Sequence, residues 1–253
     1  MVQFAVILPA AGKSNRFGDS LRKKVFVDLA GRAVWARSAE AFSHRKDVVQ
    51  TILVVSPDDE GWFREKFQAS LLFMNVEVVC GGDERADSVC EGLKRVRDDV
   101  DFVAVHDAAR PLIAARWIDE VFEAATKSDA AILATRVTNT VKRVNDGTIV
   151  ETVDRSQLWG AQTPQVFRKH LLLDAYAARE GRTATDEAEL VEWFGHPVSI
   201  VEGSPINMKI TTQDDLQVAA ALLNSLPASH LPESLSGDSP NPSKQPAPPP
   251  GLW

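Results

Sequence analysis

Short apolar runs alternate with amphipathic stretches along most of the chain. The strand-like runs are rich in Val and Ile, and they are Phe4–Leu8, Thr51–Val55, Val76–Cys80, Phe102–His106, Ala130–Thr135 and Val198–Val201. Stretches with helical spacing of apolar residues follow them: Val34–Phe42, Trp62–Gln68, Ala86–Val96, Arg116–Lys127, Arg168–Arg179, Thr185–Phe194 and a last helix from about Thr212. Several strands are apolar throughout, as parallel strands covered on both faces are. The pattern predicts an α/β fold: one domain over residues 1–224 with a doubly wound, mostly parallel sheet.

One region interrupts this alternation with the pattern of a β-hairpin. Val141–Val144 and Ile149–Val153 flank Asn145-Asp146-Gly147, a sequence typical of tight hairpin turns. One side of the predicted hairpin is charged and the other is apolar. A lone hairpin is marginally stable in water, so we expect this arm, about residues 137–157, to pack on another surface, with a second subunit as the candidate.

Composition narrows the functional class. The net charge of −7 argues against a general nucleic-acid binder, which needs a broad basic surface. No apolar run approaches the roughly 18 residues of a membrane span, and the start, MVQFAVILPA, lacks the basic region of a signal peptide. Cys80 and Cys90 form no metal-ligand pattern, as expected for reduced thiols of a cytoplasmic protein.

The end of the chain differs from the rest. From Ser225 it is rich in Pro and Ser, and eight of the 14 prolines lie there. Such a composition buries too little apolar area to fold, so residues 225–253 are predicted to be disordered.

A basic glycine loop follows the first strand directly. The segment Leu8–Gly18, LPAAGKSNRFG, has small residues that let the backbone approach a ligand, and its N–H groups can cradle phosphates. A P-loop would need a glycine where Ile7 stands, and no G-x-G-x-x-G is present. Basic residues gather in and after the loop on this acidic chain, which predicts a small polyanionic ligand; they are Lys13, Arg16, Arg22, Lys23 and Lys24.

Other motifs follow later strands. GGDERADSV (Gly81–Val89) offers a tight turn with hydrogen-bonding side chains, although an ordinary turn with Asp83 as a helix N-cap explains it equally well. HDAARP (His106–Pro111) places Asp107 where it can meet a metal or a ribose and Arg110 where it can meet a phosphate, and His106 is expected to be structural.

Three short motifs complete the set. VDR, QTPQ and NMKIT place Arg155, Thr163 and Lys209 in loops or at strand ends, where each taken singly is a surface residue.

In this order the motifs resemble the 2-C-methyl-D-erythritol 4-phosphate cytidylyltransferase family over about residues 3–224. The resemblance rests on LPAAG, GGDERADS, HDAARP, TVDR, TPQ, TDEA and a final K-[IV]-T. It implies a Rossmann-like nucleotidyltransferase that transfers CMP from CTP to that polyol phosphate in the non-mevalonate isoprenoid pathway. It also implies a homodimer in which the arm crosses to the partner, and Mg²⁺ held mainly by CTP phosphates, with no certain metal ligand in the chain.

The resemblance assigns roles to individual positions. Arg16 and Lys24 match the family's transition-state stabilisers, with Lys23 as the lesser candidate because the loop is one residue longer here. The family's nucleotide contacts fall on Pro9, Ala10, Ala11, Gly12, Gly82, Asp83, Ser88 and Asp107. Its acceptor contacts fall on Arg110, Thr140, Arg155, Thr163 and Lys209.

The expected chemistry is an in-line attack of a phosphate oxygen on the α-phosphorus of CTP. The nucleophile is already an anion, so the reaction needs positioning and charge neutralisation rather than a base. Ribitol 5-phosphate is the alternative acceptor. A molybdenum-cofactor or sugar-phosphate nucleotidyltransferase would not explain HDAARP together with GGDERADS. A non-catalytic nucleotide-binding regulator would be expected to lack Arg16 and Lys24.

Overall fold

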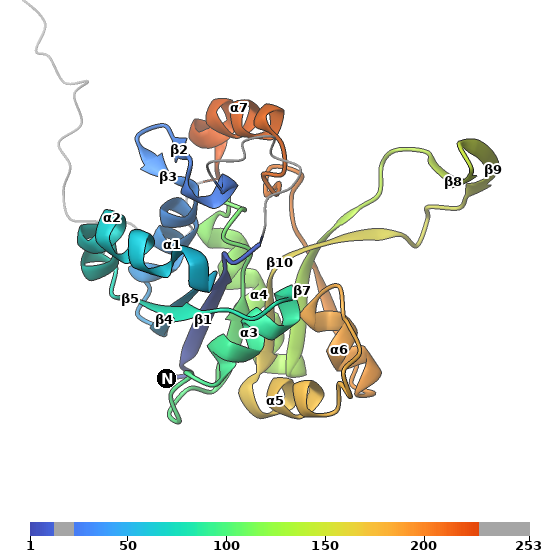
Figure 1. The fold of residues 1–253 in the computed structure, drawn as a ribbon. Helices are drawn as coiled ribbons and strands as arrows, with labels where there is room; N and C mark the ends of the chain where they lie inside the picture. The colour runs from blue at the N-terminus through green and yellow to red at the C-terminus, as the bar shows by residue number, and fades with distance from the viewer. Residues whose placement is uncertain (13–22, 228–253) are drawn as a thin grey trace, which may run out of the picture.

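The computed structural model describes residues 1–12 and 23–227, and this part of the chain contains a seven-stranded sheet of order β11-β7-β10-β6-β1-β4-β5 (Figure 1). Its strands are β1 (Phe4–Pro9), β4 (Val48–Val55), β5 (Val76–Cys80), β6 (Phe102–Val105), β7 (Ala130–Arg136), β10 (Trp159–Arg168) and β11 (Ser199–Glu202). All six predicted strands are confirmed, with ends within three residues of those expected. Neighbouring strands run parallel except on either side of β10.

Helices cover both faces of this sheet, as the doubly wound prediction requires. They are α1 (Val34–Ser43), α2 (Glu60–Phe73), α3 (Arg85–Leu93), α4 (Ala115–Ser128), α5 (Lys169–Ala177), α6 (Glu187–Trp193) and α7 (Gln213–Leu222). Strand β1 shows the two layers: Phe4, Val6 and Leu8 pack with α1, α2 and α4, whereas Ala5 and Ile7 pack with α3, α5 and α6. Both faces of β1 are therefore buried, which explains its uninterrupted apolar run.

A third apolar cluster lies beside α7. It joins this helix to a small ribbon, β2 (Asp28–Leu29) with β3 (Arg32–Ala33), through Leu29, Leu112 and Ile210. Short 3-10 turns occur at Lys24–Phe26, Pro57–Asp59 and Leu223–Ser225. Leu226 still packs on the core clusters, and the rest of the predicted tail, from residue 228, lies outside the described residues.

Strand β10 was not predicted. It runs antiparallel between β6 and β7, and its register with β7 shifts between Ala161 and Gln165. The prediction that Thr163 is a surface residue in a loop or at a strand end is wrong, because Thr163 lies within this central strand and is only 4% exposed. Its polar neighbours Gln162 and Gln165 are buried too. The strand was not predicted because these polar residues interrupt the apolar run by which a buried strand is identified.

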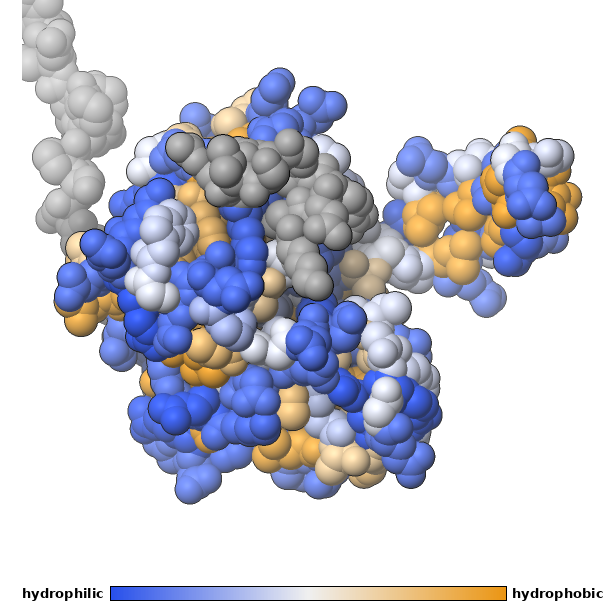
Figure 2. All heavy atoms as spheres, viewed as in Figure 1, coloured by the Kyte–Doolittle hydropathy of each residue, from blue (hydrophilic) through white to orange (hydrophobic). Residues whose placement is uncertain are grey.

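The predicted arm is confirmed as a hairpin of β8 (Val141–Asn145) and β9 (Thr148–Val153) that projects away from the sheet (Figure 1). Asp146 and Gly147 at its turn both have positive φ, as in a type I′ turn. Polar cross-strand pairs such as Arg143–Glu151 lie next to exposed apolar residues. Figure 2 shows these apolar residues as a patch on the arm. No helix among the described residues has both the length and the apolar character to span a membrane.

Candidate active site

Three of the motifs leave the sheet at the same edge, the carboxyl ends of its parallel strands. The Ala10 N–H, just after β1, donates to the carbonyl of Val54 (2.7 Å), and the Gly81 N–H, just after β5, donates to that of Val55 (2.7 Å). His106 follows β6 directly. Ligands of open α/β sheets bind at this edge, so the fold brings the glycine loop, GGDERADS and HDAARP to one place.

The Gly81-Gly82 turn brings predicted nucleotide contacts together. A Cβ on Gly81 would lie 2.5 Å from Ser88 Oγ and 3.1 Å from the Ala11 Cβ, and one on Gly82 would lie 2.6 Å from the Asp87 Cβ. Only glycine fits both positions without displacing these neighbours. Ser88 in turn donates to the Gly82 carbonyl (3.3 Å). Three of the predicted nucleotide contacts, from two motifs, are therefore neighbours.

The N-cap of α3 is Glu84, so the reading of Asp83 as the cap is wrong. Glu84 and Asp87 form a reciprocal capping box, and Asp87 also accepts from Arg179 (2.6 Å). This hydrogen bond lowers the pKa of Asp87. Asp83 is exposed at the strand ends, where it remains available to a ligand.

Asp107 is buried at the centre of a cationic cluster. Its Oδ2 lies 2.9 Å from Lys209 Nζ and 3.3 Å from Arg110 Nε, and its Oδ1 lies 3.6 Å from Arg85 Nε. Burial disfavours the carboxylate, but the positive charges of Lys209, Arg85 and Arg110 outweigh it and hold the pKa of Asp107 far below its usual range. The site thus combines three cations with one carboxylate that is ionised at neutral pH.

His106 and Thr163 form a buried hydrogen-bond chain behind Asp107. The Arg110 carbonyl can only accept, so His106 Nε2 donates to it (3.0 Å). The Asp107 N–H donates to Thr163 Oγ (3.0 Å), and the Thr163 hydroxyl therefore donates to His106 Nδ1 (3.1 Å). Burial lowers the pKa of His106 to about 4. The imidazole is neutral with both nitrogens occupied, which agrees with its predicted structural role.

The segment around Lys209 is tied to the same cluster through Asn207. Arg110 Nη1 donates to the Asn207 carbonyl (2.8 Å), and Asn207 Nδ2 donates to the Thr163 carbonyl (2.9 Å). The fold thus brings together four predicted ligand contacts: Asp107, Arg110, Thr163 and Lys209. Arg85 and Asn207 belong to the GGDERADS and NMKIT motifs, but the sequence pattern indicates no role for either residue.

Other predicted residues lie apart from this cluster. Thr140 and Arg155 are exposed on the arm, where Arg155 donates to the Thr138 carbonyl. Gly12 is the last described residue of the glycine loop, and a Cβ there would have no neighbour within 4 Å among the residues that the structure describes. Arg16 lies outside the described residues.

The two candidate lysines are the first residues that the structure describes after the glycine loop. Lys23 Nζ lies 2.5 Å from Asp59 Oδ2 and 3.4 Å from the Ala11 carbonyl oxygen. It is therefore engaged beside the glycine loop. Lys24 begins the 3-10 turn that follows.

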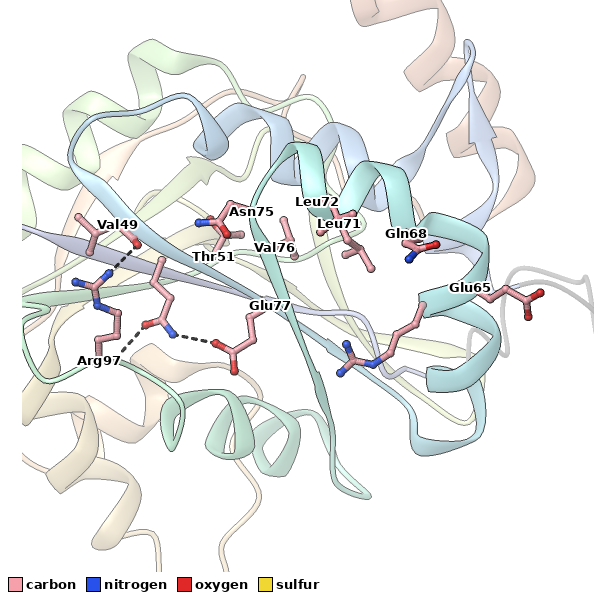
Figure 3. A pocket seen from close by; sticks show the side chains of 12 residues that line it. Val49, Thr51, Glu65, Gln68, Leu71, Leu72, Asn75, Val76, Glu77 and Arg97 are labelled. Carbon is pink, nitrogen blue, oxygen red and sulfur yellow. Dashed lines mark hydrogen bonds between the residues drawn. The ribbon is translucent and has the colours of Figure 1, made fainter.

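A hollow of about 660 Å³ lies elsewhere, between α2 and the edge strand β5 (Figure 3). It is lined by Val49 and Gln50 at the amino end of β4 and by Val76 and Glu77 at that of β5. Arg97 donates to the Val49 carbonyl across it. The hollow is at the opposite end of the strands from the three motifs and is not part of the candidate site.

Comparison with known proteins agrees with this geometry. A family model described as 2-C-methyl-D-erythritol 4-phosphate cytidylyltransferase matches residues 4–225. An enzyme of that name from Rhodopirellula baltica is 43% identical over 87% of this chain and 94% of its own length, and one from Clostridioides difficile is 35% identical over 87% and 94%.

Solved structures lead to the same family. One is a crystal structure of a 4-diphosphocytidyl-2C-methyl-D-erythritol synthase, which is 33% identical in sequence and superposes with a TM-score of 0.75. The match covers 88% of this chain and 99% of the synthase chain. A second is the 2-C-methyl-D-erythritol 4-phosphate cytidylyltransferase from Thermus thermophilus, which is 30% identical with a TM-score of 0.72. That match covers 88% of this chain and 100% of the Thermus chain. The motifs, the fold and these relatives together place the chain in the 2-C-methyl-D-erythritol 4-phosphate cytidylyltransferase family.

Proposed function

We propose that this cytidylyltransferase, which transfers CMP from CTP to 2-C-methyl-D-erythritol 4-phosphate and releases pyrophosphate, reacts at the carboxyl ends of β1, β5 and β6. The observation that carries the proposal is the cluster at Asp107, where Lys209, Arg110 and Arg85 surround one carboxylate. Their net positive charge favours an anionic ligand such as a phosphate.

CTP would occupy the side of the site formed by the glycine loop and the Gly81-Gly82 turn. The backbone from Pro9 through Ala10 and Ala11 to Gly12 can approach the nucleotide because its side chains are small. Gly82, Asp83 and Ser88 would face it from the second motif, and Asp107 would lie between nucleotide and acceptor. This arrangement uses every predicted nucleotide contact.

The acceptor phosphate would bind Arg110 and Lys209 from the other side. Thr163 would support this site by holding the Asp107 backbone, because its hydroxyl hydrogen already bonds His106. The phosphate oxygen then attacks the α-phosphorus of CTP in line, and the P–O bond to pyrophosphate breaks. Arg16 and Lys24 would stabilise the charge that develops on the α-phosphate.

No side chain needs to act as a base in this scheme, because the attacking phosphate is already ionised. His106, the histidine of the HDAARP motif, is neutral and has both ring nitrogens engaged. The site thus works by positioning and electrostatic stabilisation.

Mg²⁺ fits this site as part of the nucleotide complex rather than as a resident ion of the protein. The Asp107 carboxylate already faces three cations, a setting that suits an incoming anion better than a bare metal ion. A divalent ion on the triphosphate would neutralise its charge and that of the leaving pyrophosphate.

The arm supports a homodimer. Val144, Ile149 and Val150 are each more than half exposed on it, although β-branched apolar residues of this kind are usually buried. In a two-fold dimer the arm would cover its apolar face on the partner and deliver Arg155 and Thr140 to the partner's acceptor site. We also infer a cytoplasmic enzyme, in keeping with the free thiols of Cys80 and Cys90.

A pyrophosphate-release assay with purified enzyme and CTP tests the function directly. We expect turnover with 2-C-methyl-D-erythritol 4-phosphate and little with ribitol 5-phosphate, the acceptor that the comparisons do not favour. UTP in place of CTP should be a poor donor. Equal turnover of the two acceptors, or of the two nucleotides, would contradict the assignment.

A further inference from the structure

Glu187, the buried first residue of α6, forms an ion pair with Arg85, the first residue of α3. Arg85 Nη1 lies 2.7 Å from Glu187 Oε1 and Nη2 lies 2.9 Å from Oε2, so both ends of the guanidinium fork are held. The Tyr176 hydroxyl donates to Glu187 Oε1 as well (3.1 Å). Both helices cover the same face of the sheet (Figure 1). The pair therefore links GGDERADS to TDEA, a motif to which the reaction above assigns no role.

The position of Glu187 is itself determined by β10. Gln165 Oε1 accepts from the N–H groups of Glu187 (3.1 Å) and Ala188 (3.0 Å), and Gln165 Nε2 donates to Asp186 Oδ2 (2.8 Å). A buried amide thus caps the start of α6 from the neighbouring strand. The backbone at the start of α6 is thus held in place, and the Glu187 side chain lies against Arg85 and the Tyr176 hydroxyl.

The electrostatics of the pair require a reason beyond stability. Arg85 stands at the amino terminus of a helix, where the helix dipole disfavours a cation, and its partial burial disfavours its charge too. The charges of Glu187 and Asp107 outweigh the burial and raise the pKa of Arg85, so the guanidinium stays ionised. Buried ion pairs are weak sources of net stability, which points to a role in the site.

That role follows from the third donor of Arg85. With both Nη atoms held by Glu187, the Nε–H side faces Asp107 Oδ1 at 3.6 Å. The other carboxylate oxygen, Oδ2, faces Lys209 and Arg110. Because a guanidinium is planar and rigid, the grip of Glu187 sets the direction in which Nε points.

We propose that Glu187 is a positioning residue for the acceptor phosphate. By holding Arg85 it keeps Oδ1 of Asp107 oriented, and the carboxylate in turn holds Lys209 and Arg110 where they meet that phosphate. This inference rests on the proposed assignment of Lys209 and Arg110 to the acceptor. Without the Glu187 charge, Arg85 turns its whole fork toward Asp107 and draws the carboxylate away from the two phosphate-binding cations.

The test is steady-state kinetics of Glu187→Gln, which keeps the shape of the side chain and removes its charge. We expect the KM for 2-C-methyl-D-erythritol 4-phosphate to rise by about tenfold, the scale of one lost charge-assisted hydrogen bond, while the KM for CTP changes less than about twofold. Arg85→Gln should have the same effect. Because the two residues act through one another, the double variant should be no worse than Arg85→Gln alone.

Asp47→Asn is the matched control. Asp47 also holds an arginine through two hydrogen bonds, from Arg45 Nε (3.0 Å) and Nη2 (2.7 Å). It precedes β4 at the amino end of the sheet, away from the site. This substitution should change the melting temperature without changing either KM.

The outcomes separate the inference from the assignment on which it rests. An unchanged acceptor KM in Glu187→Gln, or purely additive effects in the double variant, would reduce the ion pair to a structural feature and overturn the inference. If Glu187→Gln does not fold, Arg85→Lys keeps the cation but loses the fork, and a wild-type acceptor KM there would equally overturn it. Lys209→Ala reports on the assignment itself, because an unchanged acceptor KM in that variant removes Lys209 from the acceptor site.

Discussion

The cluster at Asp107 and the hairpin arm differ in how far their side chains are buried and in where their partners lie. Asp107 is 6% exposed, and its partners come from α3, from its own loop and from the segment before α7. On the arm, Ile149 and Val150 are each 61% exposed, while polar neighbours such as Lys142 and Thr152 pair with each other across the hairpin. The cluster is complete within one chain, whereas the arm leaves its apolar side uncovered.

In the homodimer proposed above, this difference would divide the site between the two subunits. Charged groups that must keep a defined geometry lie in a rigid core, where distant segments hold them. The arm carries Thr140 and Arg155 on a hairpin that cannot bury its own apolar face. It therefore suits the delivery of these two residues to another copy of the chain.

The largest expected effect is that of Lys24→Ala. Losing one preorganised transition-state donor should lower kcat by at least about 100-fold, with a milder effect on the KM for CTP. Lys23→Ala is the comparison variant, because Lys23 is the lesser candidate for the same role in the same segment. Steady-state pyrophosphate release measures both. If Lys23→Ala is the crippling change and Lys24→Ala is nearly silent, the assignment of the catalytic lysine is reversed.

The second prediction concerns mixed dimers. Lys24→Ala and Arg155→Ala homodimers should each be nearly inactive, because each removes one residue from every site. In a mixed dimer one site carries both substitutions and its twin carries neither. After random exchange about half of the dimers are mixed, so activity should recover to about a quarter of wild type.

Subunit exchange must be verified independently, for example with differently tagged chains. If exchange is complete and activity does not recover, both residues act within one chain. The arm would then not complete its partner's site.

A smaller effect is expected from Ile149→Asp, which places a charge on the apolar side of the arm. An unpaired carboxylate buried at an interface costs more than the roughly 1.4 kcal/mol of a factor of ten, so the dimer dissociation constant should rise by at least about tenfold. Sedimentation at several concentrations measures this. Ile200→Asp on β11 is the control, since Ile200 is 50% exposed outside the arm. If both variants dissociate equally, the apolar side of the arm does not form the dimer interface.

The smallest effect concerns the pH dependence of the core cluster. The pKa of His106 is about 4 in the folded chain, below its ordinary value of 6.5. As pH falls below 6.5, the His106 imidazole becomes protonated in the unfolded chain but stays neutral in the folded chain. The folded state therefore loses stability on acidification. The free energy of unfolding should fall by about 1 kcal/mol from about pH 6.5 to about 5.5 because of this group. Urea unfolding of wild type and of His106→Gln at several pH values measures this. If the free energy of unfolding changes equally with pH in both proteins, the prediction is contradicted.

Two strands of the same sheet, β1 and β10, differ in how well the sequence predicts them. In β1 every residue from Phe4 to Leu8 is apolar and buried, so its pattern alone predicted a strand covered on both faces. In β10 the buried residues Gln162, Thr163 and Gln165 bond to segments about 20 to 60 residues away in the sequence. A local pattern cannot show partners at such a distance, and the strand was missed.

The site divides in the same way. The motifs identified the candidate site residues because each motif follows a strand, and parallel strands end at a common edge of the sheet. The sequence by itself therefore determined the fold class, the arm and the edge of the sheet at which the three motifs meet. Only the tertiary structure decided which side chains meet: Asp107 with Lys209 and Arg85 with Glu187. Those pairings depend on the order of strands in the sheet and on how the helices lie on it, and no spacing along the chain contains either.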